Sequence, residues 1–135
     1  MTDMRLEVVT LPVSDVDRAV DFYAGRVGFR VDHDTRLSDT VRLVQLTPPG
    51  SECSIHLGTG LPEMAGVAPG SVKRLHLVVD DVAEVREGLL GRGVPVSAVD
   101  VYRGGVRMAS FSDPDGNSWV LQQMGPSHRE QRTGE

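Results

Sequence analysis

The chain has 135 residues, of which 39% are hydrophobic and 24% charged, the size and composition of one globular domain. A net charge of −5 with scattered basic residues argues against nucleic acid as a partner, and no apolar stretch is long enough for a membrane span. Cys53 is the only cysteine, which excludes an internal disulfide, and without a recognisable targeting segment we expect a cytoplasmic protein.

The first half of the chain predicts a strand, a helix and three further strands. Alternating apolar residues predict the first strand over 5–13. Ser14 or Asp15 then caps a helix, which Gly25 and Gly28 end. The three further strands are predicted over 29–35, 41–47 and 53–57.

The second half repeats this order about 66 residues later, after a segment rich in Gly and Pro at 58–71. A strand is predicted over 72–79, and Asp81 with Glu84 three residues later indicates the start of a helix. The sequence Asp-Pro-Asp-Gly-Asn at 113–117 is a strong hairpin signal. The remaining strands are predicted near 95–101, 106–112 and 118–123.

The expected fold class is α+β, with two βαβββ modules that form an eight-stranded, mostly antiparallel cupped sheet with helices on its outer face. We expect a single domain over 1–124, a first module at 5–57, a linker at 58–71, a second module at 72–124 and a disordered tail at 125–135. The helices should bury Val16, Val20, Tyr23, Val82, Val85 and Leu89.

Three motifs resemble the vicinal oxygen chelate superfamily, which includes glyoxalase I, extradiol dioxygenases, fosfomycin-modifying enzymes and bleomycin-binding resistance proteins. They are Leu-Pro-Val-Ser-Asp at 11–15 with Phe-Tyr at 22–23 and Gly-Phe at 28–29, the strand and turn at 75–81, and Phe-Ser-Asp-Pro-Asp-Gly-Asn at 111–117. The resemblance covers residues 5 to about 124. It implies the fold described above and a homodimer, with modules paired within one chain or between two.

The resemblance also indicates where metal-dependent members hold a divalent ion, on four strands. Counting from Asp15, Asp81 and Asp113 places three of these positions at Val8, Arg74 and Val120, and the strand at 54–57 places the fourth at His56. Valine has no donor atom, and arginine stays protonated and has no lone pair to offer. We therefore expect no metal of the family type and no other cofactor.

Polar residues at the same end of the predicted strands suggest another chemistry. Strand alternation places His56, His76 and Gln122 in the cup, where they either hold a loosely bound ion or line a polar pocket as neutral groups. The second interpretation is favoured, because no carboxylate joins the histidines. Arg74 is expected to bind a carboxylate or phenolate in the cup; the alternative is an arginine that faces solvent or pairs locally.

These residues lead to two hypotheses for function. The first is a metal-free protein that binds a small organic ligand, including an anionic one, through His56, Arg74, His76, Gln122, Val8 and Val120. The second is a metal-free or weakly metal-assisted lyase or isomerase with His56 or His76 as general base. The sequence leaves open whether the protein is an enzyme. Aromatic residues make up only 4% of the chain, which argues against tight stacking of a large planar ligand.

Overall fold

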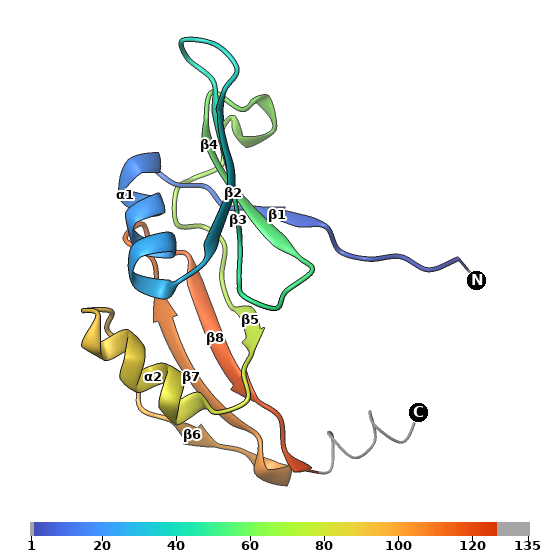
Figure 1. Ribbon diagram of the computed structural model, residues 1–135, viewed down its shortest axis with the longest axis vertical. Coiled ribbons are helices and arrows are strands. Elements are labelled where there is room, and N and C mark those ends of the chain that lie inside the picture. Colours follow the sequence, from blue (N-terminus) through green and yellow to red (C-terminus); the bar gives the residue numbers. More distant parts are fainter. Residues whose placement is uncertain (1, 127–135) are drawn as a thin grey trace. The chain divides into compact units, whose positions relative to one another are not determined.

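The computed structural model describes residues 2–126, which form two compact units (Figure 1). The first unit contains the chain up to Val72 together with Asp113–Asn117, and the second contains Lys73–Ser112 and the chain from Ser118 on. The tail expected at 125–135 lies, from residue 127 on, outside the described residues. None of the described helices is long and apolar enough to cross a membrane.

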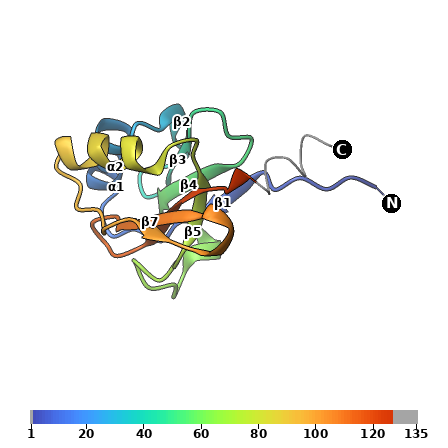
Figure 2. The same ribbon diagram turned by 90° about the horizontal axis from the view of Figure 1, so that it is seen from below.

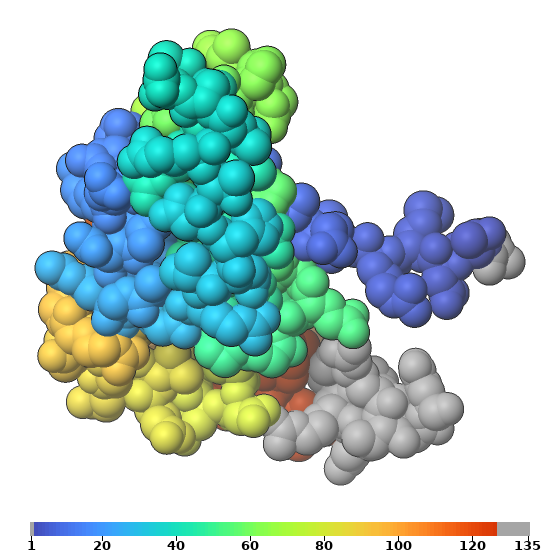
Figure 3. Space-filling view, turned by 45° about the horizontal axis from the view of Figure 1, so that its top comes forward, coloured from blue at the N-terminus to red at the C-terminus, as the bar shows by residue number. Residues whose placement is uncertain are grey.

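The first unit is one four-stranded sheet with a helical segment. Its strands follow the order β1-β4-β3-β2, in which β1 runs parallel to β4 and the other pairs are antiparallel. β2 is the exposed edge, and its cyan atoms face the viewer in Figure 3. The elements are β1 (Val8–Thr10), α1 (Val16–Val20), a π-helical turn (Asp21–Val27), β2 (Arg30–Arg36), β3 (Arg42–Thr47), β4 (Ser54–Thr59) and a 3-10 turn (Pro62–Met64).

The second unit repeats this arrangement. Its sheet has the order β5-β8-β7-β6 with β5 parallel to β8, and α2 packs against β7 and β8 (Figure 2). The elements are β5 (Leu75–Val78), α2 (Val82–Gly91), β6 (Asp100–Val101), a 3-10 turn (Arg103–Gly105), β7 (Arg107–Ser112) and β8 (Ser118–Gln123). The α+β class and the two βαβββ modules are thus confirmed, and in each sheet antiparallel pairs outnumber the parallel one.

Side-chain caps begin both helices where the sequence predicted them. The carboxylate of Asp15 accepts the backbone N–H of Arg18 at 3.0 Å, and that of Asp81 accepts the N–H of Glu84 at 3.2 Å. The first helix then widens into the π-helical turn, so that Gly25 lies inside it. Gly28 ends the segment with φ of 97°, a conformation that suits glycine best.

Two predicted strands are shorter than expected because their backbones lack a continuous ladder. The strand expected over 5–13 pairs only along Val8–Thr10, and the one near 95–101 only at Asp100–Val101. At Ser97 the side-chain hydroxyl takes the place of a ladder carbonyl, since it accepts the backbone N–H of Ser110 at 2.9 Å. A hydroxyl that competes in this way is not visible in a hydrophobic pattern.

The core of each unit lies between its helix and one face of its sheet. Tyr23 is fully buried, and its ring lies 5.0 Å from that of Phe22 and 5.5 Å from that of Phe29. In the second unit the parallel rings of Phe111 and Trp119 lie 6.3 Å apart. Of the residues expected in the core, Val16, Tyr23, Val82 and Leu89 are confirmed as buried, whereas Val20 and Val85 are half-buried.

The hairpin turn at 113–117 is held by a buried carboxylate. One oxygen of Asp113 accepts the backbone N–H groups of residues 115, 116 and 117 at 2.9–3.0 Å. The other accepts the Tyr23 hydroxyl and the Asn117 side-chain amide, both at 2.8 Å. Asn117 also donates to the carbonyl of Pro12 at 2.9 Å, and a side chain at Gly70 would collide with the carbonyl of Asp115. The turn is therefore an integral part of the first unit.

Removing the Tyr23 hydroxyl should destabilise the protein, because a buried ionised acceptor loses one of its donors. We expect Tyr23→Phe to lower the free energy of unfolding by about 1.5–3 kcal/mol in chemical denaturation. Tyr102→Phe is the matched control, since Tyr102 is 50% exposed. Equal, small losses for both variants would contradict the role assigned to this hydrogen bond.

Candidate functional site

The six predicted site residues divide between the two units. Val8 and His56 belong to the first, and the others, Arg74, His76, Val120 and Gln122, belong to the second. The expectation that all six line one cavity stays a prediction.

The polar face of the first sheet carries a hydrogen-bonded network around His56. Strand register places Gln45 opposite His56, and the ring Nε2 lies 3.0 Å from Gln45 Oε1. Gln45 Nε2 in turn donates to Asp32 Oδ2 at 3.2 Å. We call the residues of this set the Asp32–His56 network: Arg30, Asp32, Gln45, Thr47, Ser54 and His56.

A β-bulge brings Asp32 into this network. The register between β2 and β3 shifts between Val31 and His33, which leaves Asp32 as an extra residue beside Gln45. Its carboxylate accepts hydrogen bonds from the hydroxyl of Thr47 and from Arg30 Nε, the latter at 2.9 Å. These two hydrogen bonds, first from Thr47 and then from Arg30, lower the pKa of Asp32 to about 2. Asp32 is therefore ionised at any physiological pH.

The environment of His56 favours its neutral form. Burial is the main cause that lowers the pKa of His56, and the nearby His33 lowers it further. Glu63 and Glu7 act in the opposite direction with a smaller effect. Val8 pairs with Ser54 across β1 and β4 and adds no donor atom to this face.

Arg74 and Val120 come together at a small polar pocket of the second unit. The pocket has a volume of about 70 Å³. Antiparallel register places Ser110 of β7 opposite Val120 of β8. A correct prediction of the strand pairing would therefore have indicated that these two residues are neighbours. The pocket is lined by Arg74, Ser97, Asp100, Tyr102, Met108, Ala109, Ser110 and Val120. Of these eight residues, the sequence had indicated Arg74 and Val120.

The backbone of Arg74 adopts a left-handed conformation with φ of 61°, which is unusual for a residue other than glycine. Its N–H donates to the hydroxyl of Ser118 at 2.8 Å, and β5 begins only at the next residue. Strand alternation, which needs extended backbone, therefore applies from Leu75 and not at Arg74. The Arg74 side chain is exposed, and among residues 2–126 no carboxylate lies within ion-pair distance of its guanidinium.

His76 and Gln122 form a pair of their own outside the lining of that pocket. His76 Nδ1 lies 2.6 Å from Gln122 Oε1, and Gln122 Nε2 donates to the sulfur of Met124 at 3.0 Å. Both residues are on adjacent parallel strands, β5 and β8. The structure therefore brings these two of the predicted site residues together.

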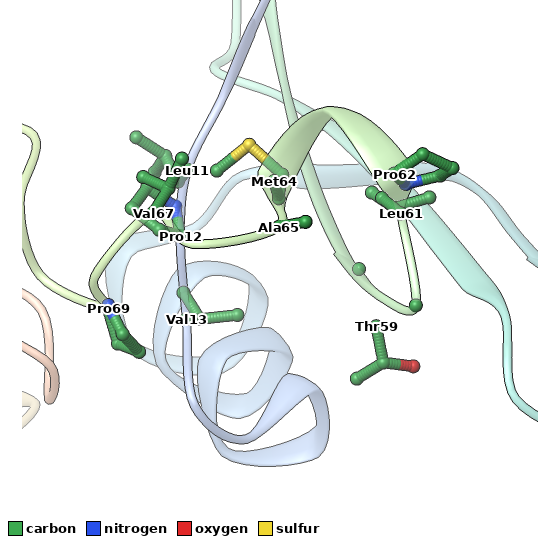
Figure 4. Close-up of a pocket in the computed structure, with 12 residues that line it drawn as sticks. Leu11, Pro12, Val13, Thr59, Leu61, Pro62, Met64, Ala65, Val67 and Pro69 are labelled. Atoms are coloured by element: carbon green, nitrogen blue, oxygen red, sulfur yellow. The ribbon is translucent and has the colours of Figure 1, made fainter.

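A larger, apolar pocket of about 390 Å³ occurs in the first unit (Figure 4). It lies between the segment that follows β1 and the chain after β4, with Met64 and Val67 on one side and Val13 on the other. None of the six predicted site residues lines it. Its apolar lining offers no side chain for acid–base or ionic chemistry.

The sequence pattern of the Glyoxalase/Bleomycin resistance protein/Dioxygenase superfamily matches residues 5–121. The chain belongs to this superfamily. A search of curated proteins found no match. Among solved structures, the chain is similar to TnmS3, an antibiotic binding protein from Streptomyces sp. CB03234, with 36% identity, coverage of 93% of this chain and 99% of that one, and a TM-score of 0.77.

Two further crystal structures show the same similarity. A glyoxalase/bleomycin resistance protein from Streptomyces sp. CB03234 is 37% identical over 88% of this chain and 100% of that one, with a TM-score of 0.75. A member of the superfamily from Sphaerobacter thermophilus DSM 20745 is 32% identical over 90% of this chain and 98% of that one, with a TM-score of 0.76.

The residues at the four positions that the resemblance assigns to a metal do not fit a divalent ion. Val8 and Val120 carry no donor atom, and the Arg74 guanidinium has hydrogens to donate but no lone pair. His56 alone is a suitable ligand, and its Nε2 is already engaged by Gln45. Within residues 2–126, no three His, Cys, Asp or Glu side chains gather as a metal site requires.

The lowered pKa of Asp32 predicts a specific loss of stability in acid. Because the pKa is about 2 in the folded protein and 3.8 for a free aspartate side chain, the unfolded chain binds more protons between these values. This contribution to stability is complete above about pH 4 and disappears as the pH falls through about 2. Asp32→Asn should therefore flatten the decline in denaturation midpoint between about pH 5 and about pH 2, relative to the exposed control Asp39→Asn. Parallel pH profiles for the two variants would refute this.

Proposed function

We propose that this protein binds a small organic ligand and holds an anionic or acceptor-rich group of it with Arg74, without a divalent ion. The observation that carries the proposal is the exposed guanidinium beside a polar pocket, free of any ion pair within the described residues. An arginine offers up to five N–H donors in a planar fork that matches carboxylates and phenolates. A divalent cation and a guanidinium attract the same kind of ligand atom.

The size and lining of the pocket suggest how it takes part. A volume of about 70 Å³ suits a single polar group of a larger ligand rather than a whole drug-sized molecule. Hydroxyl groups of Ser97, Tyr102 and Ser110 add donors and acceptors around Arg74. The antibiotic binding described for TnmS3 supports a small organic molecule as the ligand class.

Aromatic stacking contributes little to this proposed binding. Phe111 and Trp119 are 4% and 3% exposed and stack on each other inside the second unit. Tyr102 is the exposed aromatic residue of the pocket lining. Specificity would therefore come mainly from polar contacts.

The runner-up function is a metal-free lyase or isomerase with a histidine base. It is favoured by one observation: burial lowers the pKa of His56 and so keeps the imidazole neutral, the form that accepts a proton. The two functions differ in the fate of the ligand. A binding protein releases its ligand unchanged after long incubation, whereas an enzyme releases a product that mass spectrometry detects.

We also propose a homodimer in a reducing, cytoplasmic compartment. Exposed valines on the two edge strands of the second sheet support association, since Val78 on β5 and Val101 on β6 are 64% and 63% exposed. The compartment is supported by Cys53, which is a free thiol.

Native mass spectrometry of the purified protein tests the metal-free dimer directly. We expect the mass of two 14.6 kDa chains with no stoichiometric Zn²⁺, Mn²⁺, Fe²⁺ or Ni²⁺, including after dialysis against each ion. One tightly held ion per chain would overturn the metal-free proposal, and a monomer at tens of micromolar would overturn the dimer.

The Arg74→Ala variant tests the ligand contact. For an anionic ligand found by thermal-shift screening of carboxylates, phenols and antibiotics, and whose charge is buried on binding, we expect calorimetry to show a loss of about 2–5 kcal/mol in binding free energy, because that buried charge is left unpaired. Arg107→Ala is the matched control, since Arg107 is an exposed arginine of the same sheet outside the pocket lining. Equal losses for both variants would show that Arg74 contributes only its positive charge and makes no specific contact with the ligand. Thermal stability should be unchanged in either variant.

A further inference from the structure

The Asp32–His56 network contains one group whose hydrogen-bonding role is fixed by its chemistry. An ionised carboxylate only accepts, and Asp32 already accepts from Arg30 at 2.9 Å and from Thr47. The Gln45 side-chain atom beside Asp32 Oδ2 must therefore be a hydrogen-bond donor. This requirement sets the donor and acceptor of every other hydrogen bond between Asp32, Gln45 and His56.

The carboxylate sets the orientation of the Gln45 side chain. Its Nε2 donates to Asp32 Oδ2 at 3.2 Å and lies 3.5 Å from the hydroxyl of Ser54. The reverse orientation would place a carbonyl oxygen against the carboxylate, and two acceptors repel each other. Gln45 Oε1 is therefore the atom presented to His56.

The amide oxygen in turn fixes the proton on His56. Oε1 only accepts, so His56 Nε2 at 3.0 Å must carry the hydrogen. In a neutral imidazole the other nitrogen, Nδ1, then bears a lone pair. Among the residues that the structure describes, no hydrogen-bond partner to His56 Nδ1 is present.

We propose that Asp32 and Gln45 act as positioning residues that hold His56 in the Nε2–H tautomer, so that Nδ1 accepts a hydrogen bond from a hydroxyl, phenol or ammonium group of a ligand. The tautomer depends on the first unit alone, whereas its use by a ligand rests on the function proposed above. This chemistry is the converse of that at Arg74, which only donates. The first unit thus recognises a donor group.

The second unit holds an internal comparison. Gln122 Oε1 lies 2.6 Å from Nδ1 of His76, while its Nε2 donates to the sulfur of Met124, which only accepts. By the same reasoning His76 carries its proton on Nδ1. The two histidines should therefore show opposite tautomers in one protein.

The tautomers are read from two-bond ¹H–¹⁵N correlations of the ¹⁵N-labelled full chain at about pH 7.5. We expect the Nε2–H pattern for His56 and the Nδ1–H pattern for His76. Gln45→Met keeps an unbranched side chain but removes both amide atoms, and it should convert His56 to a mixture of tautomers and leave His76 unchanged. Gln122→Met is the matched control and should do the reverse.

Two outcomes would overturn the assignment of the His56 tautomer. They are an Nδ1–H pattern for His56 in the unaltered protein, and an unchanged pattern for His56 in Gln45→Met. The His76 signals report whether that variant is folded, and the measurement on the unaltered protein needs no variant.

Phenol and anisole test the ligand contact, because they differ in one hydroxyl hydrogen. Phenol should move the His56 Nδ1 resonance toward its hydrogen-bonded value with a saturable dependence, and should bind about two- to tenfold more tightly than anisole. Equal effects, or an Nδ1 resonance that phenol leaves unmoved, would overturn donor recognition. If Arg74-dependent binding of an anion persists in that case, the proposed function stands and this inference alone fails. The opposite pair of results would remove Arg74 from the proposed function and leave donor recognition at His56 intact.

Discussion

The buried carboxylate of Asp113 is the interaction on which the first unit depends most. It is 5% exposed and accepts hydrogen bonds from three backbone N–H groups, from Asn117 and from Tyr23, so that both oxygens of the buried carboxylate are satisfied by N–H and O–H dipoles. The aspartate that closes the hairpin turn thereby also fixes the helical segment through Tyr23. This explains why a turn between β7 and β8 belongs to the first unit.

Features with a local cause could be predicted from the sequence, and features with a distant cause could not. Asp15 and Asp81 cap helices, and Gly28 ends one, because each acts on backbone groups within a few residues. By contrast, the strand near 95–101 is short because Ser97 bonds to Ser110 across the sheet. The backbone of Arg74 is left-handed and so departs from strand geometry, and nothing in the sequence marks this conformation.

The candidate site shows the same division. Counting back from the aspartate turn at residue 81 selected Arg74, and the predicted strand at 53–57 selected His56; that both belong to a ligand site stays a prediction. The Asp32–His56 network could not be predicted from the sequence, because it depends on a bulge that sets Asp32 and His33 beside Gln45. A bulge adds one residue to one strand and shifts its register, and nothing in the residues at 31–33 marks the point where this happens.

The two modules carry different side chains on one backbone plan. The pairing of Val8 with Ser54 in the first sheet corresponds to Arg74 beside Ser118 in the second, where the serine hydroxyl holds the backbone of Arg74. In the first module, an acid and an amide form a hydrogen-bonded network with His56, whose Nδ1 is proposed to present a lone pair. The second presents a guanidinium. Under the proposed function, each module recognises a ligand group with a protein atom instead of a cation, an acceptor nitrogen in the first and a guanidinium donor in the second. Ligand groups would then be selected by the donors and acceptors that they offer, whereas a metal centre attracts ligand oxygens with less regard to their protons.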